Sequence, residues 1–72
     1  MSRARRREQQ ELQDAAVREL RELRASLAGA FSAFNHTADP ALLEASILEI
    51  GALQSRYCSA LRSFKALCRE AG

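Results

Sequence analysis

The sequence predicts an all-α protein, an antiparallel two-helix hairpin that dimerises into a four-helix bundle. The composition of the 72 residues leans to Ala, Leu, Glu and Arg, which are strong helix formers, with one Pro and no Trp. Two apolar patterns follow a seven-residue repeat, and a short polar stretch separates them. A chain of this length forms one domain at most and supports only a small core.

Residues 1–7 are predicted to form a flexible basic tail, and residues 8–72 a single hairpin domain. The tail contains Arg3, Arg5, Arg6 and Arg7 and no acid. Arginine near a helix N-terminus opposes the helix dipole, which favours a frayed, solvated segment. The alternative is a phosphate-binding arm for nucleic acid or an anionic membrane, although no base-reading motif or interleaved aromatic residue accompanies it.

The first helix is expected over about residues 8–34. Its apolar positions alternate spacings of four and three, at Ala16, Leu20, Leu23, Leu27, Ala30 and Phe34. Val17 and Phe31 widen this stripe on one side. Gly29 weakens the helix by about 1 kcal/mol relative to Ala and suggests a close backbone approach.

Residues 35–39 are expected to form the turn between the helices. Asn35 tolerates the left-handed conformation in which many helices end. Asp39 is a strong N-cap residue, and Pro40 suits the first position of a helix because its missing amide would be unpaired there. The motif therefore predicts that one helix stops and another starts.

The second helix is expected over about residues 40–70. The residues expected to face the first helix, which we call the seam, also keep the seven-residue repeat. They are Leu43, Ile47, Ile50, Gln54, Tyr57, Leu61, Phe64 and Cys68. Leu53, Ala60 and Leu67 form a flanking row. Two helices that touch along one line would leave this row in water, so a second hairpin is expected to cover it.

Several polar residues within these elements invite a chemical interpretation. His36 is expected to be an exposed turn residue, because no nucleophile or further metal ligand lies near it in the sequence. Cys58 and Cys68 fit neither a redox motif nor a zinc pair, and are expected to be reduced thiols, with a Cys58 link across a dimer as the alternative. Gln54 either fixes the register of the seam or lies at its solvated edge.

The adjacent residues Arg56 and Tyr57 are interpreted separately. Tyr57 on the seam would bury its ring and needs a polar partner for its hydroxyl group. Arg56 is expected to be a surface charge or to pair with Glu19 or Glu22 of the facing helix, rather than to bind a ligand.

Residues 30–65 resemble the YaaL-like family, short uncharacterised proteins of spore-forming Gram-positive bacteria. The resemblance is carried by Ala30 to Phe34, Asp39-Pro40, Leu43, Ile47, Glu49, Ala52, Arg56-Tyr57, Leu61 and Lys65. It covers about half of the chain and implies a small bacterial helical protein without an established activity. It supplies no catalytic residue, cofactor or metal ligand.

These patterns predict a non-enzymatic protein that acts by homodimerisation or by packing on a helical protein partner. The residues expected to carry the interaction are Leu20, Leu23, Leu27, Phe34, Ile47, Ile50, Tyr57, Leu61 and Phe64. The alternative is a nucleic-acid accessory protein that binds phosphates through Arg3, Arg5, Arg6, Arg7, Arg62, Lys65 and Arg69. The basic start is followed by a polar segment and no window approaches a membrane span, so a cytoplasmic location is expected, with no cofactor or metal.

Overall fold

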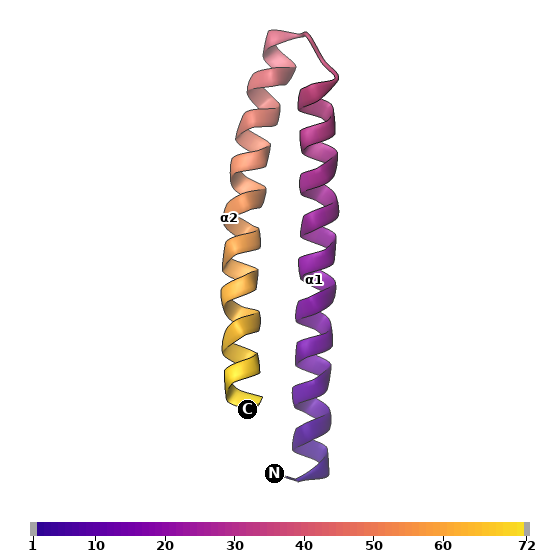
Figure 1. The fold of residues 1–72 in the computed structure, drawn as a ribbon, viewed down its shortest axis with the longest axis vertical. Helices are drawn as coiled ribbons and strands as arrows, with labels where there is room; N and C mark the ends of the chain where they lie inside the picture. Colours follow the sequence, from indigo (N-terminus) through magenta and orange to yellow (C-terminus); the bar gives the residue numbers. More distant parts are fainter. Residues whose placement is uncertain (1, 72) are drawn as a thin grey trace.

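Two long helices run antiparallel, side by side, in the computed structural model, which describes residues 2–71 (Figure 1). Helix α1 spans Arg3–Asn35 and helix α2 spans Pro40–Ala71. The hairpin measures 56 × 14 × 12 Å, and the start of α1 and the end of α2 lie at the end opposite the turn (Figure 1). This arrangement confirms the predicted all-α hairpin.

Helix α1 begins at Arg3, five residues before its expected start. Ser2 caps it: the Ser2 Oγ atom accepts a hydrogen bond from the Arg5 amide at 3.2 Å, and the Ser2 carbonyl accepts one from the Arg6 amide at 3.0 Å. Serine is among the best N-cap residues, and arginine has a high helix propensity. The segment expected as a flexible tail therefore forms the first turns of α1 from Arg3 onward.

Helix α1 ends without a left-handed residue. The His36 amide donates to the Ser32 carbonyl at 3.1 Å and to the Ala33 carbonyl at 3.4 Å, and the His36 Nδ1 atom lies 2.7 Å from the Ser32 oxygen. No described residue has a positive φ angle, so Asn35 does not adopt the left-handed conformation expected of it. His36 itself closes the helix, and it is exposed as predicted.

The start of α2 follows the predicted capping pattern. The Asp39 Oδ1 atom accepts a hydrogen bond from the Ala41 amide at 2.9 Å, and Pro40 occupies the first helical position. The Thr37 hydroxyl group accepts from the Asp39 amide at 3.2 Å and so orients the capping residue. These bonds satisfy amide groups that the helix cannot pair internally.

Replacing Asp39 by Ala should therefore lower the free energy of unfolding by about 1 kcal/mol, the usual effect of removing an N-cap carboxylate. Urea unfolding followed by far-UV circular dichroism measures this change. Ser55→Ala, an exposed position inside α2, is the matched control and should leave the stability nearly unchanged. Equal unfolding midpoints for the two variants would contradict a capping role for Asp39.

The core lies along the line where the helices touch. Its buried residues are Leu23, Ala30, Leu53 and Ala60, and the half-buried residues packed against them are Leu20, Leu27, Ile50 and Tyr57. At the open end, the Gln9 Nε2 atom donates a hydrogen bond to the Leu67 carbonyl at 3.2 Å and fixes the register. The helices are antiparallel, so counting in steps of seven runs forward along α1 from Gln9 and backward along α2 from Leu67. Two steps place Leu23 opposite Leu53, and three steps place Ala30 opposite Ser46.

The seam of α2 differs from the predicted one. Leu53 and Ala60, expected in a flanking row, are 7% and 8% exposed, whereas Ile47 is 57% exposed and Gln54 lies in water. The row of Leu53 and the row of Gln54 both have helical spacing from Leu43 and Ile50. The structure buries the row of Leu53, so the Gln54 amide stays in water. A buried amide without partners would be unfavourable. Of the two interpretations of Gln54, the structure therefore shows the solvated edge.

Candidate functional site

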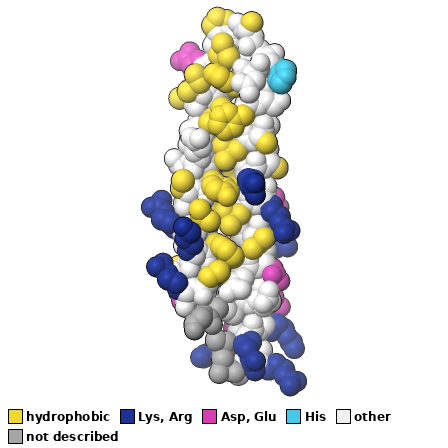
Figure 2. Space-filling model, in the orientation of Figure 1, with side chains coloured by type: hydrophobic (Ala, Val, Ile, Leu, Met, Phe, Trp, Pro, Cys, Tyr) yellow, Lys and Arg dark blue, Asp and Glu magenta, His cyan; other side chains and the backbone are white. Residues whose placement is uncertain are grey.

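One side of the hairpin presents a continuous apolar strip in the space-filling view (Figure 2). We call it the front face and define it by the rows next to the core, at Val17, Arg24 and Phe31 of α1 and at Ile47, Gln54, Leu61 and Cys68 of α2. Residues seven apart share one side of a helix. The two rows belong to the same side of the molecule because Phe31, Ile47 and Gln54 line a common groove.

The half of the front face near the turn contains this groove, which we call the turn groove. It has a volume of about 500 Å³ and is lined by Phe31, Phe34, Asn35, Ile47, Ile50, Gly51 and Gln54. Phe31 is 44% exposed and Ile47 is 57% exposed, although both are large apolar residues. Apolar side chains of this size gathered in one open groove are typical of interaction surfaces. The described lining residues carry no charge.

The turn groove has room for a larger residue at Gly51, which is one of its lining residues. A Cβ atom built at this position meets no atom within 4 Å. The same holds for Gly29, so the close backbone approach expected there is wrong. Gly29 lies in the row of Glu22 on the opposite side of the hairpin, because residues seven apart share one side of a helix.

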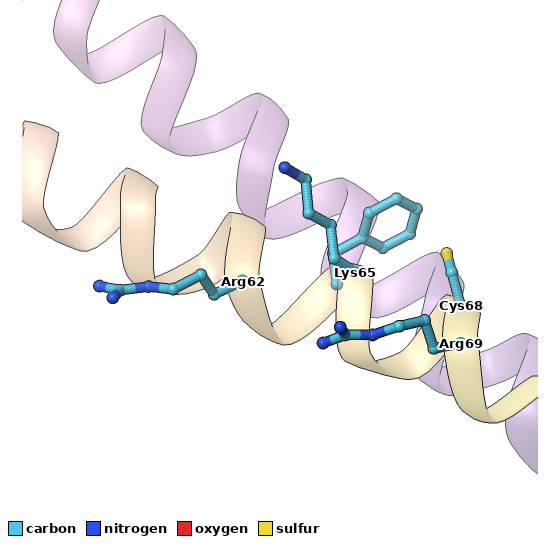
Figure 3. Close-up of a pocket in the computed structure, with 5 residues that line it drawn as sticks. Arg62, Lys65, Cys68 and Arg69 are labelled. Atoms are coloured by element: carbon cyan, nitrogen blue, oxygen red, sulfur yellow. The ribbon is translucent and has the colours of Figure 1, made fainter.

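The half of the front face near the chain ends contains a second depression, the basic pocket. It has a volume of about 600 Å³ and is lined by Arg62, Phe64, Lys65, Cys68 and Arg69. Figure 3 shows the side chains of Arg62 and Arg69 running in the same direction, with Lys65 between them along α2. Three cations thus share the lining of this pocket with an aromatic ring and a thiol group.

Charge is segregated between the two sides of the hairpin. Lys and Arg side chains flank the apolar strip on both helices in its lower part (Figure 2). By helical position and pocket lining, the front face carries Arg3, Arg7, Arg21, Arg24, Arg62, Lys65 and Arg69, against Asp14 and Glu44. By helical position, the opposite face carries Glu8, Glu19, Glu22, Glu49 and Glu70, against Arg5 and Arg56. The front face is therefore cationic and the opposite face acidic.

Most residues predicted to carry an interaction contribute to the hairpin itself. Leu23 is buried, and Leu20, Leu27, Ile50 and Tyr57 pack against the core. Phe34, Leu61 and Phe64 are half-buried at its edge, and Ile47 is exposed. The residues that remain available on the front face are the edge residues and Ile47. Phe31 and Gly51 also line the turn groove and were missed as site residues, although the sequence shows that Phe31 widens the first apolar stripe.

The predicted phosphate-binding residues divide into two groups. Arg62, Lys65 and Arg69 lie together in the basic pocket. Arg3, Arg5, Arg6 and Arg7 are exposed on the first turns of α1, where successive residues point about 100° apart and so cannot share one face. Of that group, Arg3 lies in the row of Val17 and Phe31, and Arg7 lies in the row of Asn35, which lines the turn groove.

The residues considered for redox chemistry, ligand binding or metal binding do not form a site in the part of the chain that the structure describes. Cys58 and Cys68 are free and exposed, and Arg56 is exposed on the acidic side. Residues 2–71 bring together no group of three or more His, Cys, Asp or Glu side chains that could hold a metal ion. Neither helix, over the part that the structure describes, has an apolar stretch long enough to cross a bilayer.

Comparison of the chain with protein-family models, with curated proteins and with solved structures gave no match. The resemblance to the YaaL-like family therefore stays a prediction.

Proposed function

We propose that the protein is a non-enzymatic interaction module that acts by packing its front face on further helices. The observation that carries the proposal is the turn groove, in which Phe31 and Ile47 leave about half of their surface in water. Full burial of a large apolar side chain contributes about 1.5–3 kcal/mol. Covering the groove with another helix would therefore stabilise an assembly, and helices commonly bind one another through such apolar faces.

The covering helices come either from a second copy or from another protein. Two hairpins packed through their front faces would form the expected four-helix bundle. A parallel arrangement would set the two basic pockets beside each other, and like charges repel. A head-to-tail arrangement instead brings the basic pocket of one copy near Glu44 of the other. The charge distribution therefore supports the head-to-tail dimer as the self-associated form.

A paired substitution at the two glycines tests the proposal. Gly51→Gln places a side chain in the turn groove, whereas Gly29→Gln places the same side chain on the opposite side. Both changes raise helix propensity by a similar amount. We expect Gly51→Gln to weaken self-association, or binding of a helical peptide, by about tenfold or more, because a filled groove cannot accept a partner side chain.

Light scattering over a dilution series measures the self-association, starting from the monomer mass of 8.0 kDa. A mass that rises with concentration identifies the homodimer. A constant monomer mass leaves the helical partner as the occupant, and peptide titration then reports on the groove. If Gly51→Gln and Gly29→Gln behave alike in both assays, the front face is not the interaction surface.

Nucleic-acid binding is the second candidate, because the basic pocket gathers Arg62, Lys65 and Arg69. Cations of this kind bind phosphate groups without reading sequence. The apolar strip would find no counterpart in a phosphate backbone, however, and would stay in water. The first proposal accounts for both the strip and the cations.

A further inference from the structure

We propose that the natural occupant of the front face is an amphipathic helix of another protein that carries carboxylate side chains on both flanks of its apolar stripe. The inference rests on the proposed function and adds the chemistry of the partner. It follows from the position of the cations relative to the apolar strip.

The cations of the front face lie on both sides of the strip. Arg21 and Arg24 belong to α1, and Lys65 and Arg69 belong to α2. A helix about 10 Å wide that lies over the line between α1 and α2 would place its apolar residues on the strip. Its flanking positions would then lie above the two cationic rows, as charged flanks do in helical bundles. Glu or Asp at these flanking positions would pair with the cations.

The charge of the front face also differs between its two ends. The lining of the turn groove is uncharged, whereas the basic pocket at the other end carries three cations. The partner helix should therefore be uncharged and apolar in the half that covers Phe31 and Ile47. Its carboxylates should lie in the half that covers Arg62, Lys65 and Arg69.

Other occupants fit the face less well. A second copy packed head-to-tail would place only Glu44 near each basic pocket, so most cations of the front face would have no acidic partner. A phosphate backbone would leave the strip uncovered, as argued above. An anionic lipid surface matches the charge, but the exposed residues Phe31 and Ile47 line a recess together with the half-buried Phe34 and Ile50. A bilayer binds apolar side chains that protrude from a helix, whereas a recess accepts the side chains of a packed helix.

Two synthetic helical peptides, each three heptads long, provide the test. Both carry Leu along one stripe; one has Glu at the flanking positions and the other has Lys. Fluorescence anisotropy of the labelled peptides measures their affinity for the full chain at low and high salt. We expect the Glu peptide to bind at least about tenfold more tightly than the Lys peptide, and the difference to shrink at high salt.

Two double charge-reversal variants, one on each face of the hairpin, provide a matched comparison. Lys65→Glu with Arg69→Glu changes the basic pocket, whereas Arg5→Glu with Arg56→Glu makes the same change of net charge on the opposite face. The first pair should reverse the preference and favour the Lys peptide. The second pair should leave the affinity for the Glu peptide within about twofold, because opposite-face charges are screened. Equal effects of the two pairs would overturn the inference, since net charge alone would then explain the binding.

The remaining outcomes also decide the question. If both peptides bind equally and Gly51→Gln abolishes their binding, the front face packs on helices but has no preference for acidic partners, so only this inference fails. If neither peptide binds, the inference fails as well. If instead a DNA duplex or phosphatidylserine vesicles bind with the Lys65 and Arg69 dependence and the Glu peptide does not, the occupant is a phosphate-bearing surface. Far-UV circular dichroism confirms that each variant keeps its helices.

Discussion

Replacing Leu53 by Ala should unfold much of the hairpin at room temperature. Leu53 is 7% exposed and belongs to the buried cluster between the helices, together with Leu23, which is 6% exposed. Removing a buried leucine side chain lowers the free energy of unfolding by about 2–5 kcal/mol. A hairpin of this size has only about 3–5 kcal/mol of stability from its core, so this loss removes most of it.

Ile47→Ala is the matched control for Leu53→Ala, because the sequence alone places Ile47 on the seam. Ile47 is 57% exposed, so its truncation in the isolated chain should change the free energy of unfolding by less than about 1 kcal/mol. Thermal and urea unfolding at a low protein concentration measures both variants. A larger loss for Ile47→Ala than for Leu53→Ala would show that α2 packs through the predicted seam and not through the row of Leu53.

The elements of the fold could be predicted because each has a local chemical signal. Asp39 and Pro40 mark the start of α2 through capping and a missing amide, and the structure shows the expected Asp39 hydrogen bond to the Ala41 amide. The seven-residue repeat of α1 from Leu20 to Phe34 also coincides with its buried side. The start of α1 was missed because the dipole argument against arginine outweighed the capping signal of Ser2.

The seam of α2 could not be decided from spacing. Positions 46 and 47 are both within one helical turn of Leu43 and Ile50, so a three-four repeat fits either row. The choice depends on the opposite helix. The register places Ser46 opposite Ala30, and both are buried, whereas Ile47 and Gln54 are exposed. The spacing of residues within α2 does not show which residues of α1 face them, so it cannot decide between the two rows.

The candidate site depends on this choice. With Ile47, Gln54 and Cys68 on the seam, the cations near them would lie beside a buried line. With these residues at the edge, the same cations flank an open strip, and the segregation of charge between the two faces becomes visible. The basic segments at the ends of the chain are visible in the sequence, but their assignment to one face requires knowledge of which row of α2 is buried.

Replacing Ala30 by Leu should be the second strongly destabilising change. Ala30 is 5% exposed and Ser46 is 8% exposed, and the seven-residue register counted from Gln9 and Leu67 places these two small residues opposite each other. A larger side chain inserted in a packed core costs about 1–3 kcal/mol, because it forces the neighbouring backbones apart. Leucine has good helix propensity, so an effect on helix formation itself is excluded.

Ala33→Leu provides the control for Ala30→Leu, since Ala33 is exposed on the same turn of α1. Urea unfolding should show a lower midpoint for Ala30→Leu only. The double variant Ala30→Leu with Ser46→Gly should recover part of the loss, although glycine itself weakens α2 by up to about 1 kcal/mol. Recovery requires that the two positions face each other, because it arises from the space vacated by the serine side chain. If Ala30→Leu is as stable as the Ala33 variant, the helices are not in close contact at this layer, and the register set by Gln9 and Leu67 is wrong.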